Sequence, residues 1–265
     1  MRRPFYASAA VVCFFCLLVT CALGPQIKDG TILTTNTNLQ GNKLTLRFTR
    51  GPDFGQVKQI GFFKLLLMPQ IAVWVEDTLG NHLQTLYVTH KFAKQQWGPA
   101  LHNKDSCFRT SSLPCWLNKY VRAGNTAPTT NHPLPDAVTA ATPQGCFDLN
   151  TTLVTAFPAI VKVEINSSFD YNKVFNSGRK ASRINGQPAV VYEGRLNGYS
   201  PLYPVVAMKV AGHSGETGED SLLYKDISGL TTATGIFSCI NLLLSPPASV
   251  QNDSAIRTGA TKRAE

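Results

Sequence analysis

Residues 71–76, Ile-Ala-Val-Trp-Val-Glu, and residues 83–89, Leu-Gln-Thr-Leu-Tyr-Val-Thr, decide the fold class of this chain. Both runs are rich in β-branched and aromatic residues, which favour strands. The turn-forming residues 77–81, Asp-Thr-Leu-Gly-Asn, separate them. The spacing therefore predicts a β-hairpin, with the aromatic side chain of Trp74 in the core.

Short runs of the same kind recur along the chain and are bounded by Gly, Pro, Asn or Ser. Residues 43–48 alternate polar with apolar side chains, and further β-rich runs cover residues 159–165, 188–193, 204–211 and 232–244. Only residues 115–122 suggest a helix, and a short one. This pattern predicts an all-β protein, an antiparallel β-sandwich with long loops and at most short helices.

The N-terminus has the pattern of an export signal. Arg2 and Arg3 precede an apolar stretch over residues 9–23, which is too short for a membrane span. Residues 18–21, Leu-Val-Thr-Cys, resemble the bacterial lipoprotein box, although Thr20 stands where a smaller residue is usual. The sequence predicts acylation of Cys21, which would anchor the protein in the bacterial cell envelope, at the periplasmic face or the outer membrane. Cleavage by the general signal peptidase and an uncleaved anchor stay open.

The predicted organisation follows from these boundaries. We expect a signal peptide over 1–20, an N-terminal tether over 21–40 and a β-sandwich domain over 41–244. A long loop insertion, about 91–145, interrupts the domain, since residues 124–145 are rich in Thr, Ala, Asn and Pro. Residues 245–265 read as a disordered tail.

The cysteine count is consistent with export. Removal of the signal discards two of the seven cysteines, and acylation would use Cys21, so Cys107, Cys115, Cys146 and Cys239 remain. An even remainder in an oxidising compartment predicts two disulfides. Pairing of Cys107 with Cys115 across their short loop is the simplest arrangement, but all three connectivities stay open.

The charge of the chain is basic, with 25 Lys and Arg against 16 Asp and Glu, a formal net charge of +9. Loss of Arg2 and Arg3 with the signal leaves +7. The densest clusters are Arg179-Lys180 with Arg183, and Lys262-Arg263. No aromatic stacking platform accompanies them, so nucleic acid is not an expected partner. Attraction to an anionic lipid or a cell-wall polymer fits the charge, as does a simple solvated surface.

Several short elements resemble one family, a group of uncharacterised exported bacterial proteins whose domain is likened to the Ig-like domain of flagellar hook-capping proteins. The hairpin region leads to Trp97, then to a Leu-Pro-x-Trp element at residues 113–116, then to residues 135–143, Pro-Asp-Ala-Val-Thr-Ala-Ala-Thr-Pro. Later segments at 163–172, 185–188 and 229–233 keep the same order. The resemblance spans about residues 40–243 and implies an Ig-like, β-rich exported protein. It carries over no catalytic residue.

One loop carries possible metal ligands. Its oxygen and imidazole groups belong to His213, Glu216, Glu219, Asp220 and Asp226. Such a set could hold a hard cation or, with the histidine, a transition metal. Its spacing does not match a calcium loop, so a solvated loop is the competing interpretation and no cofactor is expected otherwise.

Two further patterns could carry chemistry. Glu164 lies in an apolar strand with Asp170 close behind, which would suit a carboxylate pair acting on a glycan. Residues 212–216, Gly-His-Ser-Gly-Glu, resemble a nucleophile elbow but lack its last glycine. In the competing interpretations Glu164 faces outward, and Asp170 and Asn172 cap a turn.

No assembled catalytic constellation emerges from the sequence. We therefore expect a cell-envelope lipoprotein whose role is binding or structural and more likely not enzymatic. Its partners would be the membrane, through the lipid anchor, and envelope proteins or cell-wall polymer. A metal-binding or redox-accessory protein is the first alternative, and an enzyme acting on cell-wall glycan the second.

Overall fold

The computed structural model describes residues 28–60, 63–95, 97, 109–180, 184–200 and 205–245. The expected signal peptide, Cys21, Cys107 and the expected tail beyond Ser245 lie outside these residues. None of the helices within the described ranges is long and apolar enough to cross a bilayer.

One layer of the molecule is a five-stranded sheet with the order β1-β8-β2-β13-β11. Its central strands are antiparallel, and β1 pairs with β8 in parallel. Side chains alternate between a buried and an exposed face along β2 and β13, as the period-two pattern predicts. The strands are β1 (Thr31–Thr34), β2 (Asn42–Arg50), β8 (Phe147–Leu153), β11 (Val205–Ala207) and β13 (Phe237–Leu244).

The second layer is a six-stranded sheet with the order β12-β10-β9-β5-β6-β7. Its middle strands β5 and β9 are almost entirely buried, because this sheet is covered on both faces. The strands are β5 (Gln70–Glu76), β6 (His82–Thr89), β7 (Thr139–Ala140), β9 (Ala159–Asn166), β10 (Val190–Leu196) and β12 (Lys209–His213).

The main core lies between the two sheets. Phe48 of β2 stacks on Phe147 of β8 with ring centroids 4.2 Å apart, and Phe237 packs against both rings. Val73 and Val163 enter the same cluster from the six-stranded sheet. Burial of this apolar surface is the main favourable contribution to folding.

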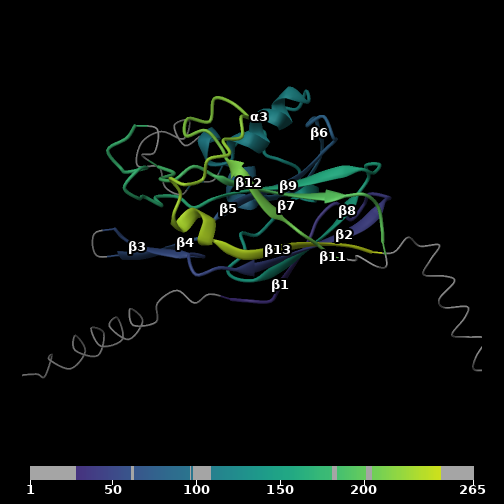
Figure 1. Ribbon diagram of the computed structural model, residues 1–265, viewed down its shortest axis with the longest axis horizontal. Helices are drawn as coiled ribbons and strands as arrows, with labels where there is room; N and C mark the ends of the chain where they lie inside the picture. The colour runs from purple at the N-terminus through teal and green to yellow at the C-terminus, as the bar shows by residue number, and fades with distance from the viewer. Residues whose placement is uncertain are drawn as a thin grey trace, which may run out of the picture.

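A third layer covers the outer face of the six-stranded sheet (Figure 1). It contains α2 (His90–Ala93), α3 (Pro114–Arg122) and the short 3-10 helices η2 (Thr110–Ser112) and η3 (Asp136–Val138). Another 3-10 helix, η4 (Thr232–Gly235), precedes β13. We call α2, α3 and the segments that pack with them the cap.

A separate two-stranded sheet projects at the left of Figure 1. It consists of β3 (Gln56–Ile60) and β4 (Phe63–Leu67), which pair antiparallel and join neither main sheet. Its base is tied to the body because Gln56 Nε2 donates a hydrogen bond to Asp170 Oδ1 at 2.7 Å. Below, we call it the β3–β4 hairpin.

The structure confirms the all-β sandwich class, the β5–β6 hairpin, the short helix at α3 and the burial of Trp74. It differs from the sequence prediction at several places. Residues 232–235, expected within a β-rich run, form the 3-10 helix η4, and strands β3, β4 and β8 lie where no strand was expected. Strand β1 lies within the expected tether and pairs with β8. Residues 204–211, expected as one strand, form β11 and β12 in different sheets, with buried Met208 between them donating its N–H to Ile240 O at 2.9 Å.

Candidate functional site

The cap is held to the sheet by an aromatic cluster centred on Trp116. Its ring stacks on Tyr120 at 5.0 Å and meets the edge of Phe92 at 5.8 Å. The indole N–H donates to Thr85 Oγ1 of β6 at 3.0 Å, so the polar atom of this fully buried side chain is satisfied. The cap residues therefore have a fixed position over strands β5 and β6.

Glu164 of β9 caps the N-terminus of α3 from the sheet below. Its two carboxylate oxygens accept hydrogen bonds from the backbone N–H groups of Cys115, at 3.0 Å, and Trp116, at 2.8 Å. These are among the first amides of the helix, which have no partner within it. The residue before the helix, Leu113, has an apolar side chain, which cannot accept a hydrogen bond from these amides.

The same carboxyl group is fully buried. Burial raises the pKa of Glu164 from its usual 4.5 to about 8, although the two N–H donors act in the opposite direction. Its register partners on the two adjacent strands are Ala72 and Val191, which are both buried and apolar and pack in one cluster with Trp116. Glu164 is therefore a structural group enclosed by protein, and the expected outward position was wrong.

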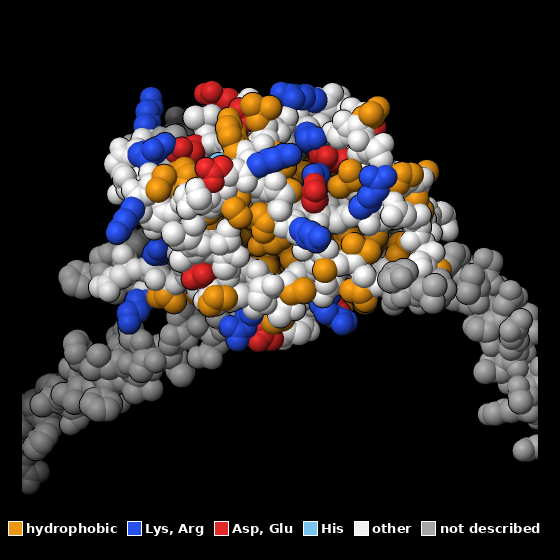
Figure 2. Space-filling model, viewed as in Figure 1, with side chains coloured by type: hydrophobic (Ala, Val, Ile, Leu, Met, Phe, Trp, Pro, Cys, Tyr) orange, Lys and Arg blue, Asp and Glu red, His pale blue; other side chains and the backbone are white. Residues whose placement is uncertain are grey.

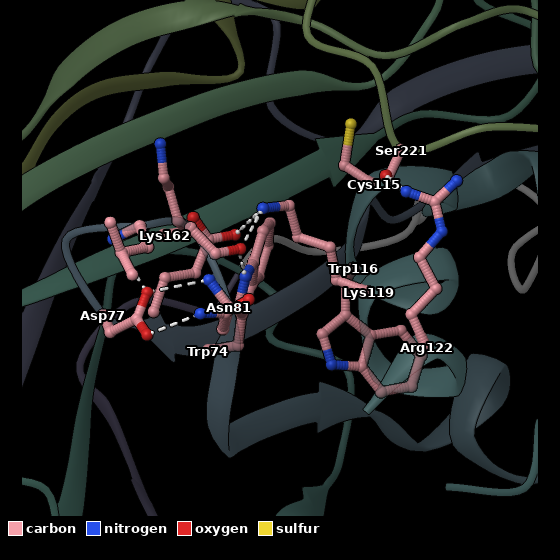
Figure 3. A network of polar contacts seen from close by, with 12 residues as sticks. Trp74, Asp77, Asn81, Cys115, Trp116, Lys119, Arg122, Lys162 and Ser221 are labelled. Carbon is pink, nitrogen blue, oxygen red and sulfur yellow. Dashed lines mark hydrogen bonds and ion pairs between the residues drawn. The ribbon is translucent and has the colours of Figure 1, made fainter. Parts of the chain in front are cut away.

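A second polar network fixes the C-terminal half of α3 (Figure 3). The ammonium of Lys119 lies 2.9 Å from the buried carboxylate of Glu76 and donates to the carbonyl of Gly80 at 2.6 Å. Glu76 also accepts the indole N–H of Trp74 at 2.8 Å. Further along the helix, Arg122 donates to Ser221 Oγ at 2.8 Å. These contacts tie α3 to the β5–β6 turn and to the loop after β12.

An open pocket of about 670 Å³ lies beside α2, between this helix and residues 136–144. Its volume is in the range of small-molecule sites. His90 and Lys91 contribute basic groups, and Thr139 and Thr142 contribute hydroxyl groups. We call it the α2 pocket; the full lining is His90, Lys91, Asp136, Thr139, Ala140, Ala141, Thr142 and Gln144.

The surroundings of the α2 pocket are basic. Arg109 lies 4.5 Å above the ring of Trp97, and Lys91 lies 5.9 Å from the same ring. Desolvation and, after it, repulsion by Arg109 lower the pKa of Lys91. Asp136 is the single acidic residue of the lining, and Lys94 holds it in an ion pair at 2.7 Å. The pocket is therefore suited to an anion.

The predicted metal-ligand residues do not come together. Glu216 pairs with Arg179 at 2.6 Å, while Asp220 and Asp226 accept backbone N–H groups of their own loops. His213 stacks on Tyr224 at 5.5 Å, and Glu219 is exposed. Within the described ranges, no group of three or more His, Cys, Asp or Glu side chains could hold a metal ion.

The two catalytic patterns are used structurally as well. Ser214 is buried, and its hydroxyl accepts the N–H of Ala189 and donates to the carbonyl of Gly215, each at 3.1 Å. Asp170 is also buried, and it accepts hydrogen bonds from Gln56, Gln187 and Thr232, whereas Glu164 lies under the cap. The two carboxylates therefore do not share a cleft. Asn172 caps a turn through the N–H groups of Val174 and Phe175, as one interpretation predicted.

The disulfide prediction needs correction. Cys115, Cys146 and Cys239 are all free thiols, and Cys107 lies outside the described residues. Cys239 pairs with Thr49 on one side of β2, and Cys146 continues the β8 register on the other side. Two strand spacings separate their backbones by about 10 Å. A disulfide requires Cα atoms within about 7 Å, so Cys146 and Cys239 cannot bond in this fold.

The residues of the α2 pocket were not among the predicted site residues. Residues 135–143 carry part of the family resemblance, but no feature of the sequence marks His90 as a site residue. No sequence motif marks Lys91 as a binding residue. It becomes part of a pocket only because β7 pairs with β6 and so places residues 139 and 140 beside the end of β6. A search for basic residues that follow directly on a strand could have found His90 and Lys91.

No protein-family model, curated protein or solved structure matches this chain.

Proposed function

We propose that this protein is an exported component of the bacterial cell envelope, anchored by lipid at Cys21, which acts by binding an anionic small molecule. The observation that carries the binding role is the α2 pocket, whose basic residues have only one acidic neighbour in the lining, already paired. The lipoprotein-like residues 18–21 support the anchor. The resemblance to exported Ig-like bacterial proteins agrees with this proposal.

The state of the candidate catalytic groups favours binding over catalysis. The carboxyl of Glu164 and the hydroxyl of Ser214 are enclosed and engaged with backbone groups. A nucleophile or a general base has to reach its substrate, and neither group is accessible to one. The polar groups that line the α2 pocket, by contrast, face open space.

The expected ligand carries a carboxylate or phosphate group. Lys91 and His90 would contact the charged group, and the hydroxyls of Thr139 and Thr142 would accept or donate hydrogen bonds. The pocket is open to solvent, so part of the ligand would stay accessible. Polar rather than apolar contacts would then dominate recognition.

Mass spectrometry of the protein recovered from the membrane fraction tests both parts of this proposal. The denatured mass should begin at Cys21 and include an acylated glyceride. The native mass should show an additional small anionic molecule, which the Lys91→Gln variant loses. Lys209→Gln, an exposed lysine on β12, serves as the matched control and should retain it.

Each part has its own contradicting result. A mature chain that starts after Cys21, or that still contains residues 1–20, would remove the anchor. The binding role of the α2 pocket would be contradicted by a native mass equal to the denatured mass. It would also be contradicted if Lys91→Gln retained the ligand as well as Lys209→Gln does.

A further inference from the structure

One face of the β3–β4 hairpin carries apolar side chains, the exposed Val57 and the half-buried Leu66. Val57 is 54% exposed, and it stands opposite Leu66 in the register, so the two share one face. The next pair on that face is Gln59 with the exposed Lys64. A two-stranded sheet is marginally stable in water on its own. Contact with an apolar phase would therefore stabilise it.

This hairpin and the start of the described chain lie at the same end of the molecule. Lys28 donates its backbone N–H to Gln144 O at 2.9 Å, and Asp29 pairs with Arg50 at 3.2 Å. Arg50 is the last residue of β2, and β3 begins at Gln56. The β5–β6 turn lies at the opposite end, because Gln84 near its base bonds to Thr152 at the far end of β8.

The chain between Cys21 and Lys28 is short, so the end of the molecule where Lys28 lies stays close to an anchor at Cys21. Six residues separate Cys21 from Lys28. Even a fully extended backbone covers only about 25 Å over that interval. With Cys21 in the bilayer, the end that bears the hairpin therefore faces the lipid headgroups.

The charge at this end suits an anionic surface. Lys58 and Lys64 lie on the hairpin, and exposed Lys173 and Lys180 lie on the loop after β9, which leaves the sheet at the same end. The pairs Asp29–Arg50 and Glu216–Arg179 add no net charge, and Asp53, between β2 and β3, offsets one of the four lysines. Figure 2 shows Lys and Arg side chains along the left margin, where the hairpin projects. Basic side chains close to a bilayer are attracted to anionic lipid.

We propose that the β3–β4 hairpin is a second membrane contact, in which Val57 and Leu66 enter the headgroup region of an anionic bilayer. Lys64, which shares their face, then lies at the level of the lipid phosphates, with its aliphatic stem along the apolar surface. Lys58 lies on the other face of the hairpin and adds positive charge close to the bilayer. This rests on the proposed function, because the orientation follows from the anchor at Cys21. The hairpin and the acyl group together restrain the tilt of the protein over the membrane.

Fluorescence of the acylated full chain in vesicles tests this contact. Val57→Trp places a reporter on the hairpin, and Leu79→Trp places one on the β5–β6 turn, where Leu79 is 86% exposed. The unsubstituted protein supplies the background from its three natural tryptophans. The vesicles contain phosphatidylcholine with brominated phosphatidylglycerol.

The expected result is a blue shift and bromine quenching for Val57→Trp, with neither for Leu79→Trp. Replacing both Lys58 and Lys64 by Glu should reduce the quenching at position 57 at least several-fold. Vesicles of phosphatidylcholine alone should also reduce it. Without any substitution, amide exchange of β3 and β4 should be slower in anionic vesicles than in detergent micelles, and that of the β5–β6 turn should not change.

Three results would overturn the proposal, and they can be distinguished. A chain that lacks acylation and does not associate with vesicles refutes the anchor, and this contact with it. An acylated, vesicle-bound chain in which positions 57 and 79 are quenched equally refutes the hairpin contact alone. Protection of β3 and β4 by isolated cell-wall polymer but not by anionic vesicles assigns the same surface to the polymer instead of the membrane.

Discussion

Glu164 and Trp116 are 48 positions apart in the chain, yet a carboxylate oxygen of Glu164 accepts the backbone N–H of Trp116 at 2.8 Å. One hydrogen bond therefore joins the middle of the six-stranded sheet to the first turn of α3. Glu164 of the sheet accepts the hydrogen bonds that a polar side chain before α3 would otherwise accept, because Leu113 at that position cannot accept them. These N-terminal amides of α3 have their hydrogen-bond acceptor only when β9 is in place beside them.

The raised pKa of Glu164 predicts a pH-dependent stability. Between its usual pKa of 4.5 and the folded value of about 8, the folded state binds more protons than the unfolded state. The free energy of unfolding should therefore fall as the pH rises through this window, by the order of a few kcal/mol. Urea denaturation at a series of pH values measures it.

The matched variants for this measurement are Glu164→Gln and Glu219→Gln. The amide cannot titrate, so Glu164→Gln should flatten the pH dependence between 4.5 and 8. Glu219 is exposed, and its replacement should leave the slope unchanged. An unchanged slope in Glu164→Gln would show that this carboxyl is not the group that titrates.

Trp116→Ala should destabilise the protein strongly. The side chain is fully buried and contacts Phe92 and Tyr120, so its removal leaves a large cavity under the cap. Truncation of a buried tryptophan costs about 3–5 kcal/mol. Val121→Ala on the same helix, where the side chain is 43% exposed, should cost much less in the same denaturation experiment. Equal effects would contradict the central position of Trp116 in the cap.

Asp136→Asn should strengthen binding of an anion in the α2 pocket. The variant removes the only negative charge of the lining and releases Lys94 from its ion pair. The carboxylate is largely exposed and screened by solvent, so the loss of the pair should change stability little. Retention of the co-purifying ligand under increasing salt measures the effect. A weaker complex in Asp136→Asn would mean that Asp136 itself contacts the ligand.

The three described thiols should differ in reactivity. Burial, with the nearby Glu164 as a smaller cause, raises the pKa of the Cys115 thiol far above its ordinary range. Maleimide at pH 8 should therefore label Cys146 and Cys239, which are partly exposed, and leave Cys115 unlabelled until the protein is denatured. Peptide mass analysis locates each adduct. A Cys146–Cys239 crosslink in native protein would contradict the strand order.

The sequence predicted the fold class because period-two patterning is a local property that survives in the sheets. It also located α3 and the β5–β6 hairpin. The turn of this hairpin is fixed locally, because the Asp77 carboxylate accepts the backbone N–H groups of Leu79 and Asn81. Strand β1 escaped prediction because it is only four residues long and gains its partner, β8, from more than 100 positions away.

The candidate site was much harder to predict than the fold. Glu164 was singled out correctly as unusual, but its partner is a helix N-terminus that the sequence does not place beside it. The cysteine count predicted disulfides, whereas β2 lies between Cys146 and Cys239. The basic groups of the α2 pocket are His90 and Lys91, and Arg109, 18 positions beyond Lys91 in the chain, approaches Lys91 at Trp97 only in the folded chain.

The parallel pairing of β1 with β8 determines how the protein withstands mechanical load. Lys28 enters beside Gln144 at one end of the five-stranded sheet, and Ser245 leaves beside Lys43 at the other. A pull between an anchor at the N-terminus and anything attached beyond the C-terminus therefore runs along the strands. The hydrogen bonds of β1 then share the force in shear, where all of them must break together, and do not open one by one from an end.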